Sequence, residues 1–311
     1  MEMSRILVTG GDGMVASSFK SLVSNHEIIL AGRKEADLLI REEFEDLLIK
    51  TKPEAVIHLA AKVGGVKSNT DYISDFYSEN VRINCNVLDA CNSLGIKSVI
   101  SLLSTCVYPD SPVYPLTEDQ VHNGSPHPSN FGYAYAKRML DVQTRAINLQ
   151  HSRNYMCAIP NNLYGPNDNF DLENGHVIPS IIRKIWEAKL SKKPPVFWGD
   201  GTPLREFTYS GDLAKCLIFL LDNKRAENLV NIGSTREVTI KYVVQVVCRL
   251  LNYNGEVLWD KSMPMGQLRK PSSNLRFRNM GWKDENYTSL ESGLEKTIGW
   301  FVENYPNVRG I

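Results

Sequence analysis

The chain has 311 residues, and its 35 basic and 35 acidic side chains give a formal net charge of zero. This balance excludes the long-range positive field that would hold nucleic acid or an anionic membrane, so we expect neither partner. No apolar run approaches the roughly 20 residues of a membrane-spanning helix, and no signal-peptide pattern follows Met1, so we expect a cytoplasmic protein. The six cysteines include no Cys-x-x-Cys pair, from which we expect reduced thiols and no metal site.

Short apolar runs alternate along the chain with longer segments of helical periodicity. This alternation predicts an α/β fold, a doubly wound, Rossmann-type parallel sheet with helices on both faces. From about Asp168 onward glycines and prolines break up the pattern, which predicts a smaller C-terminal lobe. The predicted strands are Arg5–Thr9, Glu27–Leu30, Ala55–Ala60, Ser98–Leu103 and Met156–Ile159. The predicted helices are Phe44–Ile49, Phe76–Leu94, Ala134–Leu149, Leu213–Asp222, Ile240–Leu251 and Leu290–Asn304.

A glycine-rich loop, Gly10–Ala16, follows the first predicted strand, and a helix is predicted to begin near Met14. Glycines let the backbone turn tightly and approach a pyrophosphate, whose charge then meets the N-terminus of the helix. Because the required strand and helix flank the loop, we predict a dinucleotide site; an ordinary glycine turn is the alternative. The predicted contacts in this loop are Gly10, Gly13, Met14 and Val15.

The second predicted strand is followed by two cations, Arg33 and Lys34. Folds specific for NAD usually place an acid here to bind the ribose 2′-hydroxyl, whereas cations suit the 2′-phosphate of NADP(H). We therefore predict NADP(H) as the cofactor, and the alternative is that both are solvated loop charges. Further cofactor contacts are predicted at Asp37 and Leu38, and at Leu59, Ala60 and Ala61 after the third strand. His58 beside them is equally typical of a hydrogen-bonded core histidine.

The fourth predicted strand leads into Ser104, and Tyr133 and Lys137 follow within a predicted helix. Their i, i+4 spacing places both on one helix face, where the ammonium can lower the pKa of the phenol and orient a nicotinamide ribose. A phenol so placed can protonate a carbonyl oxygen that receives hydride, while Ser104 donates a hydrogen bond to the same oxygen. Tyr135 is the alternative tyrosine, but Met139 stands four residues after it.

The order of glycine loop, serine at the end of the fourth strand, and YxxxK resembles the short-chain dehydrogenase/reductase superfamily in its extended branch, which modifies nucleotide sugars. Within that branch, Thr105 and Cys106 stand where dehydratases usually carry an Asp-Glu pair. Several segments resemble the GDP-L-fucose synthase family, and the likeness covers essentially the whole chain. They are His58–Gly65, Ser104–Pro109, His122–Gly124, Asn130–Met139, Asn162–Pro166, Asp168–Phe170, Gly175–Pro179 and Trp198–Phe207.

That family converts GDP-4-keto-6-deoxy-D-mannose to GDP-L-fucose by inverting C3 and C5 and then reducing C4 with NADPH. The resemblance implies that Ser104, Tyr133 and Lys137 carry the reduction, and that Cys106 and His176 are the base and acid of the epimerisations. The chemistry agrees, because a 4-keto group acidifies the protons on C3 and C5, and inversion needs one group to remove a proton and another to return it. Without the resemblance, Cys106 is more often a packing residue, and His176 can be a plain helix cap.

The resemblance also implies further contacts and two departures. The cofactor contacts that it adds are Leu102, Lys137, Pro160, Asn162, Leu163 and His176. The substrate contacts are Ser104, Cys106, Asn162, Lys184, Trp198 and Arg205, although Trp198 can instead be a core residue. Ala16 replaces a usual glycine, and Met265 stands where the family commonly has Asp.

These assignments predict an NADP-binding Rossmann domain over residues 1–167, with segments around 204–234 returning to it, and a substrate-binding lobe over 168–203 and 235–311. The superfamily often dimerises through the YxxxK helix and the helix before it, so we expect a homodimer. Rival interpretations are a reductase or epimerase of another nucleotide sugar, and a non-catalytic NADP-binding regulator. A thiol hydrolase using Cys106 and His176 lacks an evident third orienting residue and leaves the glycine loop unexplained.

Overall fold

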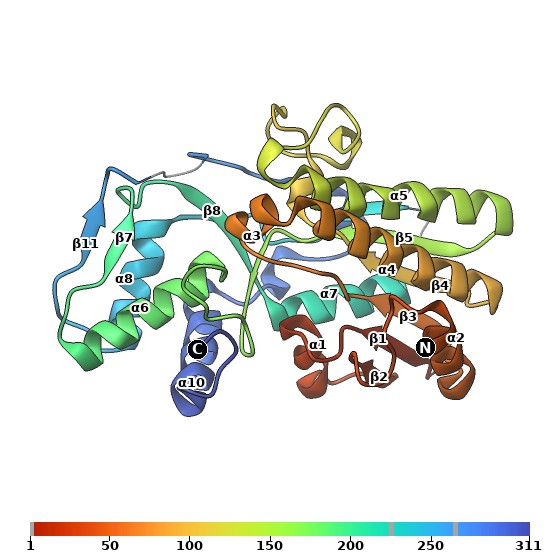
Figure 1. Cartoon of the computed structure of the whole chain (residues 1–311), viewed down its shortest axis with the longest axis horizontal. Helices are drawn as coiled ribbons and strands as arrows, with labels where there is room; N and C mark the ends of the chain where they lie inside the picture. The colour runs from red at the N-terminus through yellow and green to blue at the C-terminus, as the bar shows by residue number, and fades with distance from the viewer. Residues whose placement is uncertain (1–2, 224–226, 264–266) are drawn as a thin grey trace.

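The computed structural model describes residues 3–223, 227–263 and 267–311. Its centre is a six-stranded parallel sheet, on the right in Figure 1, as the sequence predicted. The order of its strands is β2 (Glu27–Ala31), β1 (Arg5–Thr9), β3 (Ala55–His58), β4 (Ser98–Leu102), β5 (Asn154–Ile159) and β9 (Leu229–Asn231). The five predicted strands are therefore confirmed to within two residues at their ends, with β9 added to them.

Side chains alternate across this sheet and build two hydrophobic cores. Leu7 of β1 faces one core, which contains α2 (Arg41–Thr51), α4 (Ile73–Ser93) and α5 (Phe131–His151). Ile6 and Val8 face the other, which contains α1 (Met14–Ser18) and α7 (Ser210–Asp222). The short elements of this part are α3 (Val66–Asp71) and the 3₁₀ turns η1 (Phe19–Ser21), η2 (Thr105–Val107), η3 (Glu118–Gln120) and η4 (Pro128–Asn130). Helices on both faces make the sheet doubly wound, as predicted.

The second part of the molecule is smaller and lies on the left in Figure 1. It holds the sheet β6 (Asn162–Tyr164), β8 (Leu204–Tyr209) and β10 (Glu237–Thr239), and the pair β7 (Val196–Trp198) and β11 (Leu258–Asp260). Its core joins Ile181, Val247 and Phe301. These residues belong to α6 (Val177–Ser191), α8 (Ile240–Leu250) and α10 (Leu290–Asn304), respectively.

Two features differ from the sequence-based expectation. Helix α6 was not predicted. The predicted lobe 235–311 also contains α9 (Leu275–Asn279) and η5 (Asp284–Asn286), and Phe277, Trp282 and Tyr287 pack into the core beside α1 and α7. Segment 275–287 thus lies against the Rossmann sheet because its aromatic side chains are buried there. The remaining domain boundaries stay a prediction.

The strand order contains a switch point between β1 and β3. From β1 the chain moves first to β2 on one side, and β3 then pairs with β1 on the other side. In open parallel sheets, ligands bind in the crevice at such a point, outside the carboxyl ends of the strands. The glycine loop follows β1, and Leu59, Ala60 and Ala61 follow β3, so both predicted cofactor segments lie at this crevice.

Candidate active site

The glycine loop packs tightly between the ends of β2 and β3. Gly10 has a φ of +72°, and a Cβ at this position would lie 3.0 Å from the backbone N of Ala60. A Cβ on Gly11 would lie 2.8 Å from the backbone N of Ala31. The Gly11 N–H donates a 2.8 Å hydrogen bond to the Ala31 carbonyl, which holds the loop in this close position. Only glycines fit this close backbone approach. The loop then leads directly into α1 at Met14 and Val15, so it forms a cradle that suits a dinucleotide phosphate.

Arg33 and Lys34 are both exposed just beyond β2. The Arg33 side chain is 77% exposed, and its Nη2 atom lies 3.0 Å from Asp37 Oδ2. Hydrogen bonds from the Leu39 backbone N–H and from Arg33 lower the pKa of Asp37. Leu38 packs against the core beside α2. Both cations are therefore exposed at the end of β2, and the Arg33 guanidinium is shared with Asp37.

His58 is a core residue. Its ring is fully buried, with Nδ1 2.9 Å from Thr9 Oγ1 and Nε2 3.2 Å from Asn84 Oδ1. Burial lowers the pKa of His58 to about 3, so the ring is neutral. Asn84 in turn donates a 3.0 Å hydrogen bond to the carbonyl of Ala136. The histidine thus links β1 and β3 to α4 and α5 and has no nitrogen left for a ligand.

The structure brings Ser104, Tyr133 and Lys137 together at the carboxyl end of β4. Ser104 caps η2 and accepts a 3.5 Å hydrogen bond from Cys106 N. Lys137 is buried on α5, donates a 2.8 Å hydrogen bond to the Leu102 carbonyl, and places its Nζ 5.9 Å from the centre of the Tyr133 ring. The carbonyl of Leu102 is thus the anchor of the lysine.

The pKa of Tyr133 differs from the expectation. Burial, followed by the neighbouring Cys106, raises the pKa of the phenol, whereas the sequence predicted that Lys137 lowers it. Burial also lowers the pKa of Lys137 to about 8, so the ammonium still carries most of its charge at neutral pH. Desolvation of a buried phenol therefore outweighs the ammonium in this structure. A neutral Tyr133 is the form that can donate a proton.

Cys106 lies on η2, half-buried, between two lysines. Burial raises the pKa of its thiol, while the Ser104 hydroxyl and the charges of Lys270 and Lys137 act in the opposite direction. Lys270 donates a 3.3 Å hydrogen bond to the carbonyl of Thr105, and burial lowers its own pKa. The sequence analysis missed Lys270. The available signal was its place in the Arg269-Lys270 pair close after Met265, which itself lies outside the described residues.

His176 occupies the N-cap position of α6, but its side chain makes no capping hydrogen bond. Its side chain is exposed, yet the surrounding protein, followed by the charge of Arg309, lowers the pKa of the imidazole. The cap interpretation therefore does not explain this side chain.

The loop that carries His176 is braced from two sides. Phe170 N donates a 2.8 Å hydrogen bond to the carbonyl of Arg309, and Arg183 Nη1 donates to the carbonyls of Phe170 and Gly310 at 3.0 and 2.8 Å. From the Rossmann side, Ser68 Oγ donates a 2.6 Å hydrogen bond to Asn174 Oδ1. The loop thus bridges the smaller lobe and the segment that follows β3.

The predicted substrate contacts other than Ser104 and Cys106 lie on the smaller lobe. Lys184 Nζ donates a 3.0 Å hydrogen bond to the Val196 carbonyl, and burial lowers its pKa. Trp198 is 61% exposed and therefore not a core residue. Arg205 Nη1 donates to the carbonyl of Leu204 at 2.7 Å, and Asn162 Nδ2 to that of Glu206 at 2.8 Å.

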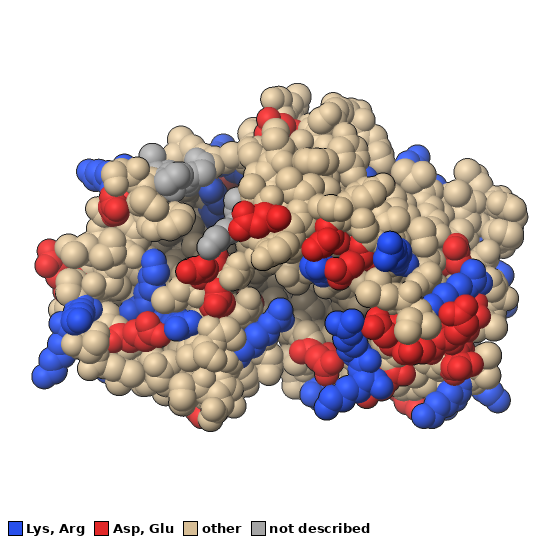
Figure 2. Space-filling model, in the orientation of Figure 1, with Lys and Arg blue, Asp and Glu red and all other residues tan. Residues whose placement is uncertain are grey.

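The remaining predicted residues are close to the sheet. Pro160 lies between β5 and β6, and Leu163 lies in β6. Leu163 packs against the core that contains α1. Ala16 is buried in that same core, where the methyl group fits without strain. Figure 2 shows the molecular face hollowed between the two lobes, with basic and acidic side chains mixed around the hollow.

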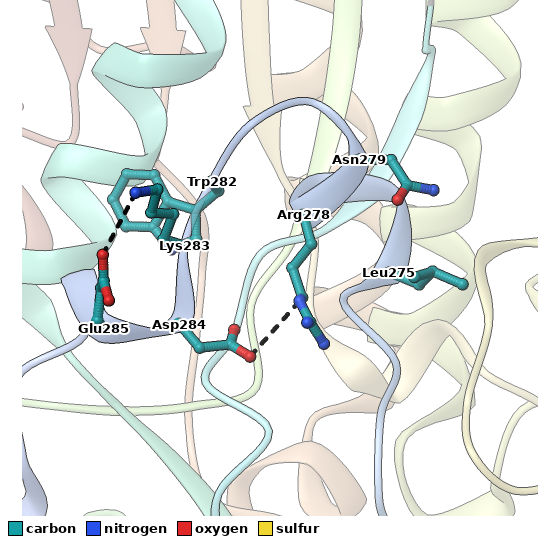
Figure 3. Close-up of a pocket in the computed structure, with 7 residues that line it drawn as sticks. All are labelled: Leu275, Arg278, Asn279, Trp282, Lys283, Asp284 and Glu285. Atoms are coloured by element: carbon teal, nitrogen blue, oxygen red, sulfur yellow. Dashed lines mark ion pairs between the residues drawn. The ribbon is translucent and has the colours of Figure 1, made fainter.

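A separate cavity of about 460 Å³ lies between α9 and η5 (Figure 3). None of the predicted site residues lines it. Its charged side chains pair with one another, since Arg278 Nε lies 3.5 Å from Asp284 Oδ2 and Lys283 Nζ 3.5 Å from Glu285 Oε1. The charged side chains of this cavity therefore neutralise one another. The cavity is distinct from the crevice at the carboxyl ends of the sheet strands.

Comparison with known proteins agrees with this geometry. The model of the NAD dependent epimerase/dehydratase family matches residues 6–233. A GDP-L-fucose synthase of Dictyostelium discoideum is 39% identical over 311 residues, 98% of this chain and 97% of that protein. One of Sinorhizobium fredii is 40% identical over 307 residues, again 98% and 97%. A crystal structure of a GDP-L-fucose synthetase from Naegleria fowleri bound to NADP superposes with a TM-score of 0.93 at 36% identity, covering 99% of this chain and 96% of that chain.

Proposed function

The chain belongs to the NAD dependent epimerase/dehydratase family and, within it, to the GDP-L-fucose synthases, and from this premise we propose how its residues carry out that reaction. It converts GDP-4-keto-6-deoxy-D-mannose to GDP-L-fucose by 3,5-epimerisation and NADPH-dependent reduction of the C4 ketone. The observation that carries the assignment of residues is the meeting of Ser104, Cys106, Tyr133 and Lys137 at the end of β4, beside the glycine cradle.

NADP(H) fits the crevice because the glycine loop is held close against the ends of β2 and β3 and leads directly into the N-terminus of α1, as a pyrophosphate site requires. The residues that would hold it are the loop from Gly10 to Val15, Arg33 beside the 2′-phosphate, and Lys137 near the nicotinamide ribose. When bound, NADPH supplies the hydride that the C4 carbon accepts. Leu59, Ala60 and Ala61 would line the opposite wall.

In the reduction, the C4 oxygen gains a proton as the carbon is reduced. Tyr133 donates this proton, and its raised pKa keeps the phenol protonated and ready to do so. Ser104 donates a hydrogen bond to the same oxygen and so stabilises the charge that develops there. Lys137, held by the Leu102 carbonyl, is the positioning charge beneath both groups.

In the epimerisations, Cys106 removes the proton from C3 or C5 and His176 returns one from the opposite face. Their opposite pKa shifts leave a neutral thiol and a neutral imidazole at rest. A neutral thiol with a neutral imidazole holds the same number of protons as the thiolate with the imidazolium that the reaction needs. Lys270 lies close enough to Cys106 to favour the thiolate, which supports this cysteine as the base.

The GDP portion lies along the smaller lobe in this proposal. Lys184 and Arg205 suit the diphosphate, and the exposed indole of Trp198 offers a flat face to the nucleotide. Lys270 extends this cationic track toward the reacting sugar. Asn162, at the start of β6, joins the cofactor and substrate sides.

A homodimer and a cytoplasmic location complete the proposal. Helices α4 and α5 lie side by side on the outer face of the sheet (Figure 1). An apolar stripe along α5, at Phe131, Tyr135, Val142 and Leu149, is exposed at spacings that keep it on one helix face. The six cysteines are free thiols, as in a reducing compartment. No helix in the described residues is long and apolar enough to cross a membrane.

The function is tested by incubating the purified protein with NADPH and GDP-4-keto-6-deoxy-D-mannose, following NADPH absorbance and identifying the product by NMR. We expect stoichiometric NADPH loss and a product with GDP-L-fucose stereochemistry. A reduced product with uninverted centres would indicate a 4-reductase of another nucleotide sugar. Cofactor binding without turnover would indicate a regulator, and either result would contradict the proposed reaction.

A further inference from the structure

The end of β2 carries acids as well as the two cations. Asp12, from the glycine loop, folds over Gly32, since a Cβ built on Gly32 would lie only 2.1 Å from Asp12 Oδ2. On the other side, Gly32 N donates a 2.7 Å hydrogen bond to Glu35 Oε2. Gly32 directly precedes Arg33. The Asp12 carboxylate therefore lies against the residue that directly precedes Arg33, at the end of β2 where an adenosine ribose would meet the strand.

The two acids differ in what they contact. Glu35 is committed to the backbone of Gly32 and holds the turn after β2. Asp12 is exposed and, among the described residues, takes part in no hydrogen bond or ion pair, so its oxygens are free to meet a ligand. The neighbouring guanidinium of Arg33 is shared, because Asp37 Oδ2 lies 3.0 Å from its Nη2. Asp37 thus already balances part of the Arg33 charge, and the unpaired carboxylate of Asp12 lies one residue away, against Gly32.

We propose that Asp12 sets the choice of dinucleotide, so that this chain binds NADH as well as NADPH with only a modest preference for the latter. The carboxylate accepts a hydrogen bond from the 2′-hydroxyl of NADH, as an acid at the end of β2 does in NAD-specific folds. The same carboxylate repels the 2′-phosphate that Arg33 attracts. This inference rests on the proposed cofactor site and refines its specificity.

The test is a calorimetric titration of NADPH and NADH against the wild type, Asp12→Asn and Asp12→Arg. Removing the Asp12 charge should lower the dissociation constant of NADPH by about three- to tenfold, the range of a solvent-exposed charge interaction with a doubly charged phosphate. Binding of NADH should stay level or weaken, because an amide is a poorer acceptor for the hydroxyl. Asp12→Arg should widen the ratio further. Raised salt should reduce the difference between wild type and variants.

Glu35→Gln is the matched control, since it removes an equal charge from the same turn while its amide oxygen still accepts from Gly32 N. Its NADPH-to-NADH ratio should stay within about twofold of the wild type. If Asp12→Asn leaves the ratio unchanged, or Glu35→Gln shifts it equally, Asp12 does not select the cofactor and the inference fails while the function stands. If the wild type binds neither dinucleotide, the proposed function itself fails. Circular dichroism of each variant checks that it is folded.

Discussion

Two tyrosines on α5 show how position decides chemistry at the residue scale. Tyr133 packs edge-to-face on Phe76 with its ring near Lys137, whereas Tyr135 is 41% exposed, with the Arg138 guanidinium 5.3 Å from its ring centre. Only Tyr133 lies near enough to Cys106 for the thiol to contribute to its raised pKa. The helical spacing that separates them was already present in the sequence.

We therefore predict that Tyr133→Phe retains cofactor binding but lowers the rate of C4 reduction by about 10²- to 10⁴-fold, the range for loss of one positioned proton donor. The rate is read from single-turnover loss of NADPH absorbance, and binding from calorimetry. Tyr135→Phe is the control and should stay near the wild-type rate. Damage from Tyr135→Phe with an active Tyr133→Phe would place the acid on the other tyrosine.

Cys106 allows the two halves of the reaction to be separated. Cys106→Ser keeps a small hydroxyl, but this group is far less acidic than a thiol, so it should be a poor base. In heavy water we expect the wild type to place deuterium at C3 and C5, and the variant to place about 10²-fold less. NADPH oxidation should survive and yield a 4-reduced sugar with uninverted centres.

Thr105→Ser is a suitable control for this experiment, because it changes the neighbouring side chain on η2 without removing the thiol. It should exchange deuterium as the wild type does. GDP-L-fucose formation at the wild-type rate by Cys106→Ser would mean that Cys106 is a packing residue and that another side chain is the base.

Residues that act through a local motif could be predicted, whereas those brought in by tertiary contacts could not. Ser104 and Lys137 follow from a strand end and an i, i+4 spacing. Lys270 donates its hydrogen bond to Thr105 from a loop that is distant in the sequence. Ser272 holds this loop against the sheets, because its N and Oγ donate to the Glu206 carboxylate and its backbone forms a β-bridge with Leu116. The direction of the Tyr133 pKa shift also depends on burial that no spacing reveals.

At the scale of elements, the two ring nitrogens of His58 on β3 form hydrogen bonds with Thr9 on β1 and Asn84 on α4. Asn84 extends this linkage to α5 through the Ala136 carbonyl. Its pKa of about 3 lies below the ordinary histidine value of 6.5, so the folded state resists a proton that the unfolded chain accepts. Its contribution to stability is complete above pH 6.5 and is lost as the pH falls toward 3. The helix with Tyr133 and Lys137 depends on this linkage.

We predict that between pH 7 and pH 5 this histidine alone lowers the free energy of unfolding by about 2 kcal/mol. Urea unfolding at both pH values measures the change. His58→Gln should be less stable at pH 7 but show a correspondingly flatter pH dependence, since the other five histidines are unchanged. An equal slope in both proteins would show that His58 is not the group that titrates.

Helix α6 was not predicted, although its sequence carries a helical pattern. Ile178, Ile181, Ile182 and Ile185 recur at helical spacing and are all buried. Pro179 near the start of the helix is compatible with its first turn, because the backbone N–H groups there have no intrahelical partner. The element was therefore predictable, whereas the return of segment 275–287 to the main sheet depends on the long-range burial of Phe277 and Trp282.

At the scale of the whole molecule, the proposed site draws its residues from two lobes. Ser104, Cys106, Tyr133 and Lys137 come from the Rossmann sheet, and His176, Lys184 and Arg205 from beyond residue 167. The loop before His176 contacts Ser68 on one side and the Arg309–Gly310 backbone on the other. The relative position of the lobes thus decides whether the base and acid can serve one sugar.

The outer face of α4 and α5 lies away from this assembly and is the proposed dimer interface. Leu149 is 88% exposed and Val142 51% exposed on one helix face. Such apolar side chains at the centre of a contact are stabilised only when a second surface covers them. A symmetric dimer brings the same helices of two chains together, so each substitution acts twice.

We predict that Val142→Glu combined with Leu149→Glu converts the dimer to a monomer, because two buried and unpaired carboxylates per chain would oppose association. Sedimentation velocity should give twice the mass of one chain for the wild type and the mass of one chain for the variant. Leu190→Glu is the control, since this exposed leucine lies on α6 in the smaller lobe and should leave the dimer intact. A monomeric wild type, or a variant that stays dimeric, would exclude this face. Because Val142 and Leu149 are exposed whereas Lys137 is buried, a monomeric variant should still bind NADPH.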